Sequence, residues 1–222
     1  MSTLSVPKQP RGKGSKEKIL HAATALFAAR GFDGVSLRDI SDKSKVNVGL
    51  IHYFFGSKEN LLKEVFLQVG DKLASRRLEL LDSACANTSE SPLTVEKIVE
   101  LFLRPAFEIA GQGPQGRAFL KLQARLQLEQ NAVSRDLRAK LYDESSRRFF
   151  QALQLVIPGV SRSTLYWRYI FVLGAYQYTL ADTGRLEVVS GGTCSSADLP
   201  RAMAEVVAFI SAGLRAPQVA AT

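Results

Sequence analysis

Apolar residues recur along this chain at the spacing of amphipathic helices. Between Ser15 and Arg30 they fall at i, i+3, i+4, i+7 and i+8, which predicts a helix that ends at Gly31. A second apolar stripe begins near Lys58 and continues to about Ala84. That length predicts one long helix, much longer than the elements before it.

The stretch from Ser36 to Lys58 predicts two short helices and the start of the long one. Ser36 and Asp39 have capping-box spacing, and Asn47 is the N-cap candidate of the second helix. Apolar residues on either side of each cap have the spacing of hydrophobic staples: Val35 with Ile40, and Val46 with Ile51. Because the intervening turn is short, the two helices must cross steeply, as in a helix-turn-helix.

The rest of the chain predicts further helices and no other kind of element. Their expected ranges are 93–110, 117–130, 134–156, 163–181 and 197–214. Residues 165–181 are apolar nearly all round, so this helix should be buried on more than one side. We expect an all-α fold of about nine helices, in which a three-helix N-terminal domain is joined by the long fourth helix to a C-terminal bundle.

Positive charge is concentrated around the helix-turn-helix. The chain of 222 residues has a net charge of +8, and residues 1–60 hold ten basic and five acidic residues. This distribution favours nucleic acid as the anionic partner. Residues 1–14 are rich in Pro, Gly, Ser and Lys, which predicts a flexible basic arm. No signal peptide or membrane-spanning segment is evident, so we expect a cytoplasmic protein without a membrane partner.

Three linked motifs, V-S-L-R-D-I, V-G-L-I-H-Y-F-F and G-S-K-E-N-L-L, resemble the DNA-binding segment of the TetR (tetracycline-repressor) family of bacterial transcriptional regulators. The resemblance runs from Ser15 to about Leu62. The chain departs from many members at Lys45, where they have glycine, at His52, where they have tyrosine, and at Leu50, where they have a small hydroxyl residue. A left-handed Lys45 would be strained by roughly 1 kcal/mol.

The resemblance, together with side-chain chemistry, assigns DNA contacts. The residues expected to face phosphates are Ser36, Arg38, Lys45, Tyr53 and Lys58. The residues expected to read bases are Val48, Gly49, Leu50 and His52. The start of this second helix is small enough to enter a major groove. A two-fold dimer would then read a palindromic operator with half-sites about one helical turn apart.

The resemblance also implies that two parts of the chain have different functions. Residues 15–60 would bind DNA, and residues 61–222 would bind a small-molecule effector and form a homodimer through the last two helices. Dense aromatic residues favour a largely apolar pocket, although an aromatic stripe is more often plain core. Our candidates for ligand contact are Gln123, Tyr166, Trp167, Tyr169 and Tyr176.

The leading hypothesis is a repressor released from its operator by a small, largely apolar effector. One alternative is a DNA-binding activator or interaction module without a small ligand, and another is a helical carrier or enzyme. Against an enzyme, the only histidines are His21 and His52, and Cys85 and Cys194 are isolated. No nucleophile, metal or phosphate-loop motif is present, so we expect no catalysis, metal or cofactor.

Overall fold

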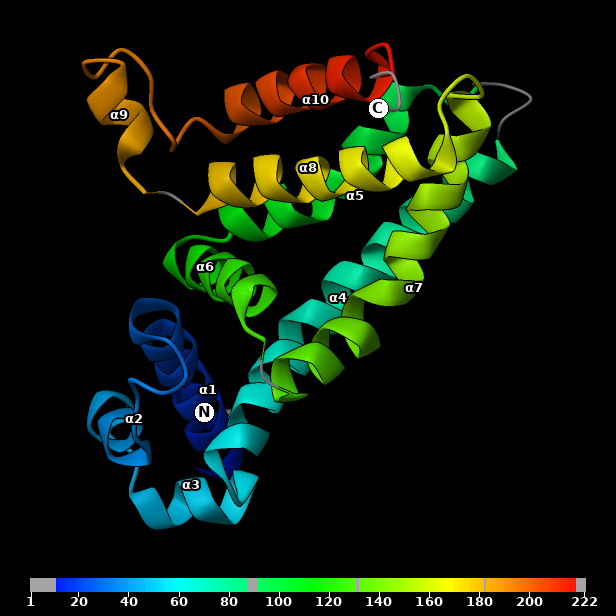
Figure 1. Ribbon diagram of the computed structural model, residues 1–222. Helices are drawn as coiled ribbons and strands as arrows, with labels where there is room; N and C mark the ends of the chain where they lie inside the picture. The colour runs from blue at the N-terminus through cyan, green and yellow to red at the C-terminus, as the bar shows by residue number, and fades with distance from the viewer. Residues whose placement is uncertain (1–10, 88–91, 131, 182, 219–222) are drawn as a thin grey trace, which may run out of the picture.

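The computed structural model describes residues 11–87, 92–130, 132–181 and 183–218, and within them every regular element is a helix (Figure 1). The all-α prediction is therefore confirmed. The helices are α1 (Arg11–Arg30), α2 (Leu37–Ser44), α3 (Val48–Phe55), α4 (Lys58–Ala86), α5 (Val95–Gly111), α6 (Pro114–Leu128), α7 (Ala132–Val156), α8 (Arg162–Leu180), α9 (Arg185–Val189) and α10 (Leu199–Arg215).

Two details differ from the sequence prediction. The described residues form ten helices rather than about nine, because α9 was not predicted. With five residues, α9 is too short to show a helical period. Helix α1 begins at Arg11 instead of Ser15, so it includes the end of the segment predicted to be a flexible arm. The rest of that predicted arm, residues 1–10, lies outside the described residues.

The predicted caps hold the helix-turn-helix in place. At α2, the backbone N–H of Asp39 donates to Ser36 Oγ at 3.1 Å, and the N–H of Ser36 donates to Asp39 Oδ2 at 2.8 Å. The hydrogen bonds from Ser36 hold the pKa of Asp39 below its ordinary value, and the charge of Arg30 adds to this effect. At α3, Asn47 Oδ1 accepts from the N–H of Gly49 at 2.7 Å. Both capping predictions are confirmed.

Side-chain contacts tie α1 to the helices that follow the helix-turn-helix. Lys16 on α1 pairs with Glu64 on α4 at 2.6 Å. Arg125 on α6 donates through Nε to the carbonyl of Ala28 at 2.9 Å, and through Nη2 to the carbonyl of Ala29 at 3.2 Å. These carbonyls belong to the last turn of α1, where a cation is electrostatically favourable.

The long helix α4 lies alongside α7 and forms one side of a helical bundle with α5, α6 and α8 (Figure 1). Helix α10 packs on α5 and α8. The apolar stripe of α4 is buried from Leu61 to Leu81, as its periodicity predicts. No helix in the described part of the chain is long and apolar enough to span a bilayer.

Lys45 is the only non-glycine residue with positive φ in the described ranges, at φ 57° and ψ 32°. A Lys45→Gly variant should relieve roughly 1 kcal/mol of strain and lose part of it to greater unfolded-state entropy. We expect the free energy of unfolding in urea to rise by about 0.5 kcal/mol.

The matched control is Lys43→Gly, an exposed lysine inside the last turn of α2. There, glycine should lower the free energy of unfolding by about 1 kcal/mol. Equal destabilisation by the two substitutions would contradict the strain assigned to Lys45.

Candidate nucleic-acid interface

Helix α3 presents an exposed face opposite its buried one. Ile51 and Phe55 are buried, whereas Gly49, His52 and Tyr53 are exposed. The Tyr53 side chain is 80% exposed. At 100° per residue, these three form the centre of the outer face, with half-buried Val48 and exposed Leu50 at its edges. The structure therefore brings the predicted base-reading residues together on one exposed helix surface.

The start of this face is kept small by local geometry. A Cβ added to Gly49 would lie 3.1 Å from Asn47 Oδ1, the oxygen that caps α3. Any side chain at this position would crowd the cap. The glycine thus serves the capping hydrogen bond as well as leaving room for close approach.

The His52 ring is fixed by its own helix terminus. Its Nδ1 lies 3.0 Å from the carbonyl oxygen of Gly56. Because a carbonyl oxygen only accepts hydrogen bonds, Nδ1 must carry the proton in this arrangement. The neutral ring is then left with Nε2 as a hydrogen-bond acceptor.

The exposed candidates for phosphate contact differ in whether their side chains already form hydrogen bonds or ion pairs within the protein. Arg38 and Lys45 are exposed, and neither has a hydrogen bond or ion pair to another described residue. Ser36 is exposed as well, but its hydroxyl accepts from the backbone of Asp39 and donates to the Asp39 carboxylate. Ser36 must share its hydroxyl between the cap and any phosphate.

Lys58 has a structural role that the sequence did not reveal. Its ammonium group donates to the carbonyl of Phe32 at 3.0 Å and to that of Val35 at 2.9 Å, and lies 4.2 Å from the ring centroid of Phe32. These contacts hold the segment before α2 against the start of α4. Two of the three ammonium protons are used, which leaves one for a phosphate.

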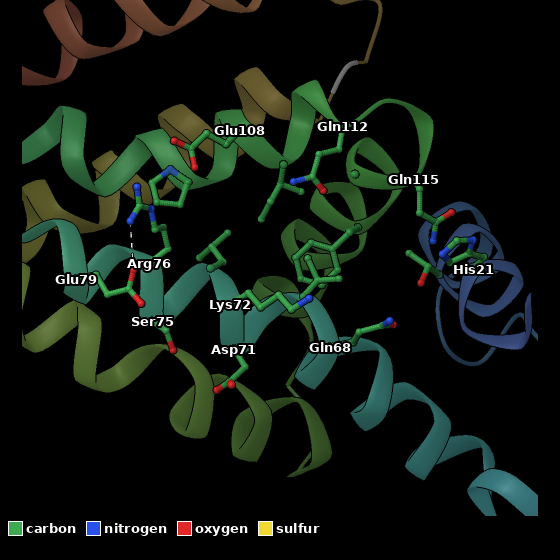
Figure 2. Close-up of a pocket in the computed structure, with 17 residues that line it drawn as sticks. His21, Gln68, Asp71, Lys72, Ser75, Arg76, Glu79, Glu108, Gln112 and Gln115 are labelled. Atoms are coloured by element: carbon green, nitrogen blue, oxygen red, sulfur yellow. Dashed lines mark hydrogen bonds and ion pairs between the residues drawn. The ribbon is translucent and has the colours of Figure 1, made fainter. Parts of the chain in front are cut away.

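A pocket of about 680 Å³ lies between α1, α4, α5 and α6 (Figure 2). Figure 2 shows His21 and Gln115 at one end, and Arg76, Glu79 and Glu108 at the other. Leu73 and Phe119 contribute apolar surface to the pocket. The sequence did not predict it, because its walls come from helices far apart in the chain.

Three of the five predicted ligand residues, Gln123, Tyr169 and Tyr176, lie in one region inside the bundle, and the other two, Tyr166 and Trp167, lie apart from them. Gln123 and Tyr176 are buried, and Tyr169 is largely covered inside the bundle. Tyr166 and Trp167 are exposed on the outer side of α8, where Tyr166 stacks on Phe150 with 4.3 Å between ring centroids. These two are on the wrong side of α8 to line a cavity inside the bundle.

Arg77 on α4 is a buried charged residue that was not among the predicted site residues, and it is 2% exposed. Its Nε donates to the carbonyl of Phe102 at 2.8 Å, and Nη2 donates to Tyr176 Oη at 3.4 Å. The guanidinium carbon lies 3.8 Å from the Phe102 ring centroid. Arg77 follows Leu73 by four residues on the apolar stripe of α4, and this polar interruption was the signal in the sequence.

Two tyrosine hydroxyls are buried near this guanidinium. Burial raises the pKa of Tyr169 to about 12 and raises the pKa of Tyr142 further, while the charge of Arg77 opposes both shifts. Neither hydroxyl has a hydrogen-bond partner of normal geometry among the described residues. Gln123 is the polar side chain beside Tyr142, and Ser146 is the one beside Tyr169.

Comparison with known families identifies the class of protein. Residues 19–65 match the family described as bacterial regulatory proteins, tetR family. Residues 100–213 match the family described as tetracyclin repressor-like, C-terminal domain. The chain therefore belongs to the TetR family of bacterial regulators, as its helix-turn-helix motifs predicted.

The chain aligns with less than half of the length of the curated relatives described here. The transcriptional repressor KstR2 of Mycolicibacterium smegmatis is 34% identical over 97 residues, covering 44% of this chain and 43% of that protein. The transcriptional repressor NicS of Pseudomonas putida is 36% identical over 72 residues, covering 31% of this chain and 34% of that protein.

Solved structures match over nearly the whole chain. A TetR-like transcriptional regulator from a Rhodococcus species has a TM-score of 0.59 and 18% identity, covering 93% of this chain and 98% of that one. PfmR, a TetR family transcriptional regulator from Thermus thermophilus, has the same TM-score and identity, covering 90% of this chain and 99% of that one. At this identity the likeness concerns the fold alone.

The contacts of Lys58 predict how its replacement changes the free energy of unfolding. Lys58→Met should lower the free energy of unfolding by about 1–2 kcal/mol, because two carbonyls lose their donor. Urea unfolding measures this. Lys63→Met, which alters an exposed lysine on the same helix, should change the value by less than about 0.5 kcal/mol. Equal effects would mean that the Lys58 contacts do not stabilise the fold.

Proposed function

We propose that this chain is a homodimeric transcriptional repressor that binds a palindromic operator through α3 and is released by a small-molecule effector. The observation that carries the proposal is the capped, exposed α3 face described above, which family membership leads us to assign to the DNA major groove. The names of KstR2 and NicS describe those relatives as repressors, which supports the same sign of regulation here.

The contacts to DNA divide into positioning and reading. Arg38, Lys45 and Tyr53 would meet phosphates, with Ser36 and the remaining proton of Lys58 as secondary donors. Val48, Gly49 and Leu50 would lie against bases, with Val48 suited to a thymine methyl group. His52, with Nε2 as acceptor, would take a hydrogen bond from the amino group of adenine or cytosine.

The outer surface of α8 and α10 supports a dimer. Its large apolar side chains are exposed: Trp167, Ile170, Phe171 and Tyr178 on α8, and Phe209 on α10. Large apolar side chains exposed together on one surface are typical of a protein–protein interface. Helix α8 was expected to need cover on two sides, and the bundle covers only one. A second copy of the same surface would cover the other by two-fold symmetry.

The long helix α4 supports a division into a DNA-binding part, residues 15–60, and an effector and dimerisation part, residues 61–222. It runs from the end of the helix-turn-helix into the bundle (Figure 1). An effector that displaces α4 in the bundle would change the spacing of the two α3 helices in the dimer. The two α3 helices would then no longer match half-sites about one helical turn apart, and the dimer would be released from the operator.

Selection of bound duplexes from a random DNA library tests DNA reading. The unaltered chain should enrich one palindrome. Arg38→Gln should weaken its binding about fivefold and lower the salt slope by about one, because one phosphate contact is lost. Tyr53→Phe should weaken binding several-fold through loss of the hydroxyl.

Both substitutions alter exposed side chains, so folding should be unaffected. Ser83→Ala is the control, because it removes an exposed hydroxyl near the end of α4 that lies away from α3. Failure to enrich any palindrome, or equal loss in the control, would refute the assignment of α3.

Sedimentation equilibrium tests the dimer. The unaltered chain should be dimeric, and Phe171→Glu should shift it to monomer and weaken palindrome binding at least tenfold, since a charge is then buried in the interface. Leu128→Glu places the same charge on an exposed leucine of α6 and should leave the dimer intact. A dimer that survives Phe171→Glu would place the interface elsewhere.

A further inference from the structure

We propose that Arg77 binds the carboxylate of an organic-acid effector, with the hydroxyls of Tyr142 and Tyr169 as additional donors. This inference rests on the proposed function, because it assigns a chemical class to the effector. It is carried by a buried positive charge without a negative partner among the described residues, by two buried hydroxyls in the same part of the bundle that lack a hydrogen bond of normal geometry, and by a neighbouring pocket.

The charge of Arg77 lacks compensation within the protein. Among the described residues it forms no ion pair, and its partners are one carbonyl, one hydroxyl and the faces of two aromatic rings. A guanidinium has five N–H donors, and these hydrogen bonds use two of the nitrogen atoms. A buried charge is costly unless it is paired. A carboxylate fits because it matches the planar fork of arginine with two oxygens.

The tyrosine hydroxyls supply an independent observation. Tyr142 Oη and Tyr169 Oη are buried, and neither has a hydrogen-bond partner of normal geometry among the described residues, although Gln123 and Ser146 lie beside them. The charge of Arg77 lowers the pKa of both hydroxyls, which places them in the same part of the bundle as Arg77. A tyrosine hydroxyl is protonated at neutral pH, and burial raises the pKa of both groups further, so both can donate to an anion.

The pocket of Figure 2 lies next to this cluster, although Arg77, Tyr142 and Tyr169 do not themselves line it. The position of a Cβ on Gly70 would lie 3.1 Å from Tyr142 Oη and 3.7 Å from Phe119 Cζ. Phe119 also lines the pocket, as does Leu73, which is one turn from Arg77 on α4. The Phe119 ring is therefore common to the pocket and to the surroundings of Tyr142. An effector with its acid on Arg77 would place an apolar body along Phe119 and Leu73.

A purely structural role for Arg77 makes different predictions. If Arg77 only braces α4 against α5 and α8, replacing it should change stability without creating or removing a preference for acids. The neighbouring Arg76 provides a matched control, because it lies at the pocket and pairs with Glu79 at 3.2 Å. An anion held merely at the pocket mouth would depend on Arg76 rather than on Arg77.

Isothermal titration calorimetry with octanoate and octanamide tests the inference. The two probes share a carbon skeleton and differ in charge. The full chain should bind octanoate at least about tenfold more tightly than octanamide. Arg77→Met should abolish this preference, and Arg76→Met should keep it. Phenylpropionate and its amide, together with laurate and its amide, repeat the comparison with bodies of other shapes.

The tyrosine variants keep the test decisive if Arg77→Met fails to fold. Tyr142→Phe and Tyr169→Phe should each weaken octanoate binding several-fold, while the unfolding temperature stays equal or rises, because a buried hydroxyl that lacks a hydrogen bond of normal geometry is removed. Equal affinity for acid and amide, loss of the preference in Arg76→Met alone, or no binding of any of the three acids would overturn the inference.

The DNA selection separates this inference from the proposed function. Palindrome binding without acid binding would remove the carboxylate site and leave the repressor proposal standing. Acid binding that depends on Arg77, without any palindrome, would remove the repressor proposal and leave the site. If both hold, adding octanoate should weaken operator binding by the unaltered chain and not by Arg77→Met.

Discussion

The structure depends on one continuous buried stripe along α4, because that stripe joins the helix-turn-helix and the bundle in a single hydrophobic core. Near its start, Leu61 and Val65 are buried at the end that joins the helix-turn-helix, and further along Leu73 and Leu81 are buried in the bundle. A helix of 29 residues transmits displacement over its whole length, since its backbone hydrogen bonds resist bending. The position of α3 is therefore mechanically linked to whatever packs against the far part of α4.

In the proposed function, the contrast between the two ends of α4 would allow effector binding and DNA reading to occur at separate places. At the start, Ser57 caps the helix and Lys58 binds the carbonyls of Phe32 and Val35, so this junction is fixed by local hydrogen bonds. At Arg77, the helix instead carries a buried charge with incomplete partners. The proposed effector would act where polar groups are incompletely satisfied, and the rigid start of α4 would transmit the displacement.

The features predictable from the sequence were those encoded locally. The caps at Ser36 and Asn47 use side chains within three residues, so spacing alone identified them. The orientation of α8 was not predictable in this way. Because its sequence is apolar nearly all round, no periodic face distinguished buried Tyr176 from exposed Trp167. The role of Lys58 was hidden for another reason, since its partners are backbone carbonyls that leave no pattern in the sequence.

Helix α6 offers a second connection between the bundle and the helix-turn-helix. Phe119 and Gln123 are buried in the bundle, and Arg125, two residues after Gln123, binds the last carbonyls of α1. A rotation of α6 caused by a ligand beside Phe119 would thus move the end of α1 directly. Since α1 is also tied to α4 through Lys16 and Glu64, the two connections meet on α1. If the proposed effector binds, the N-terminal helices should therefore move as one rigid unit, with the change confined to their position relative to the bundle.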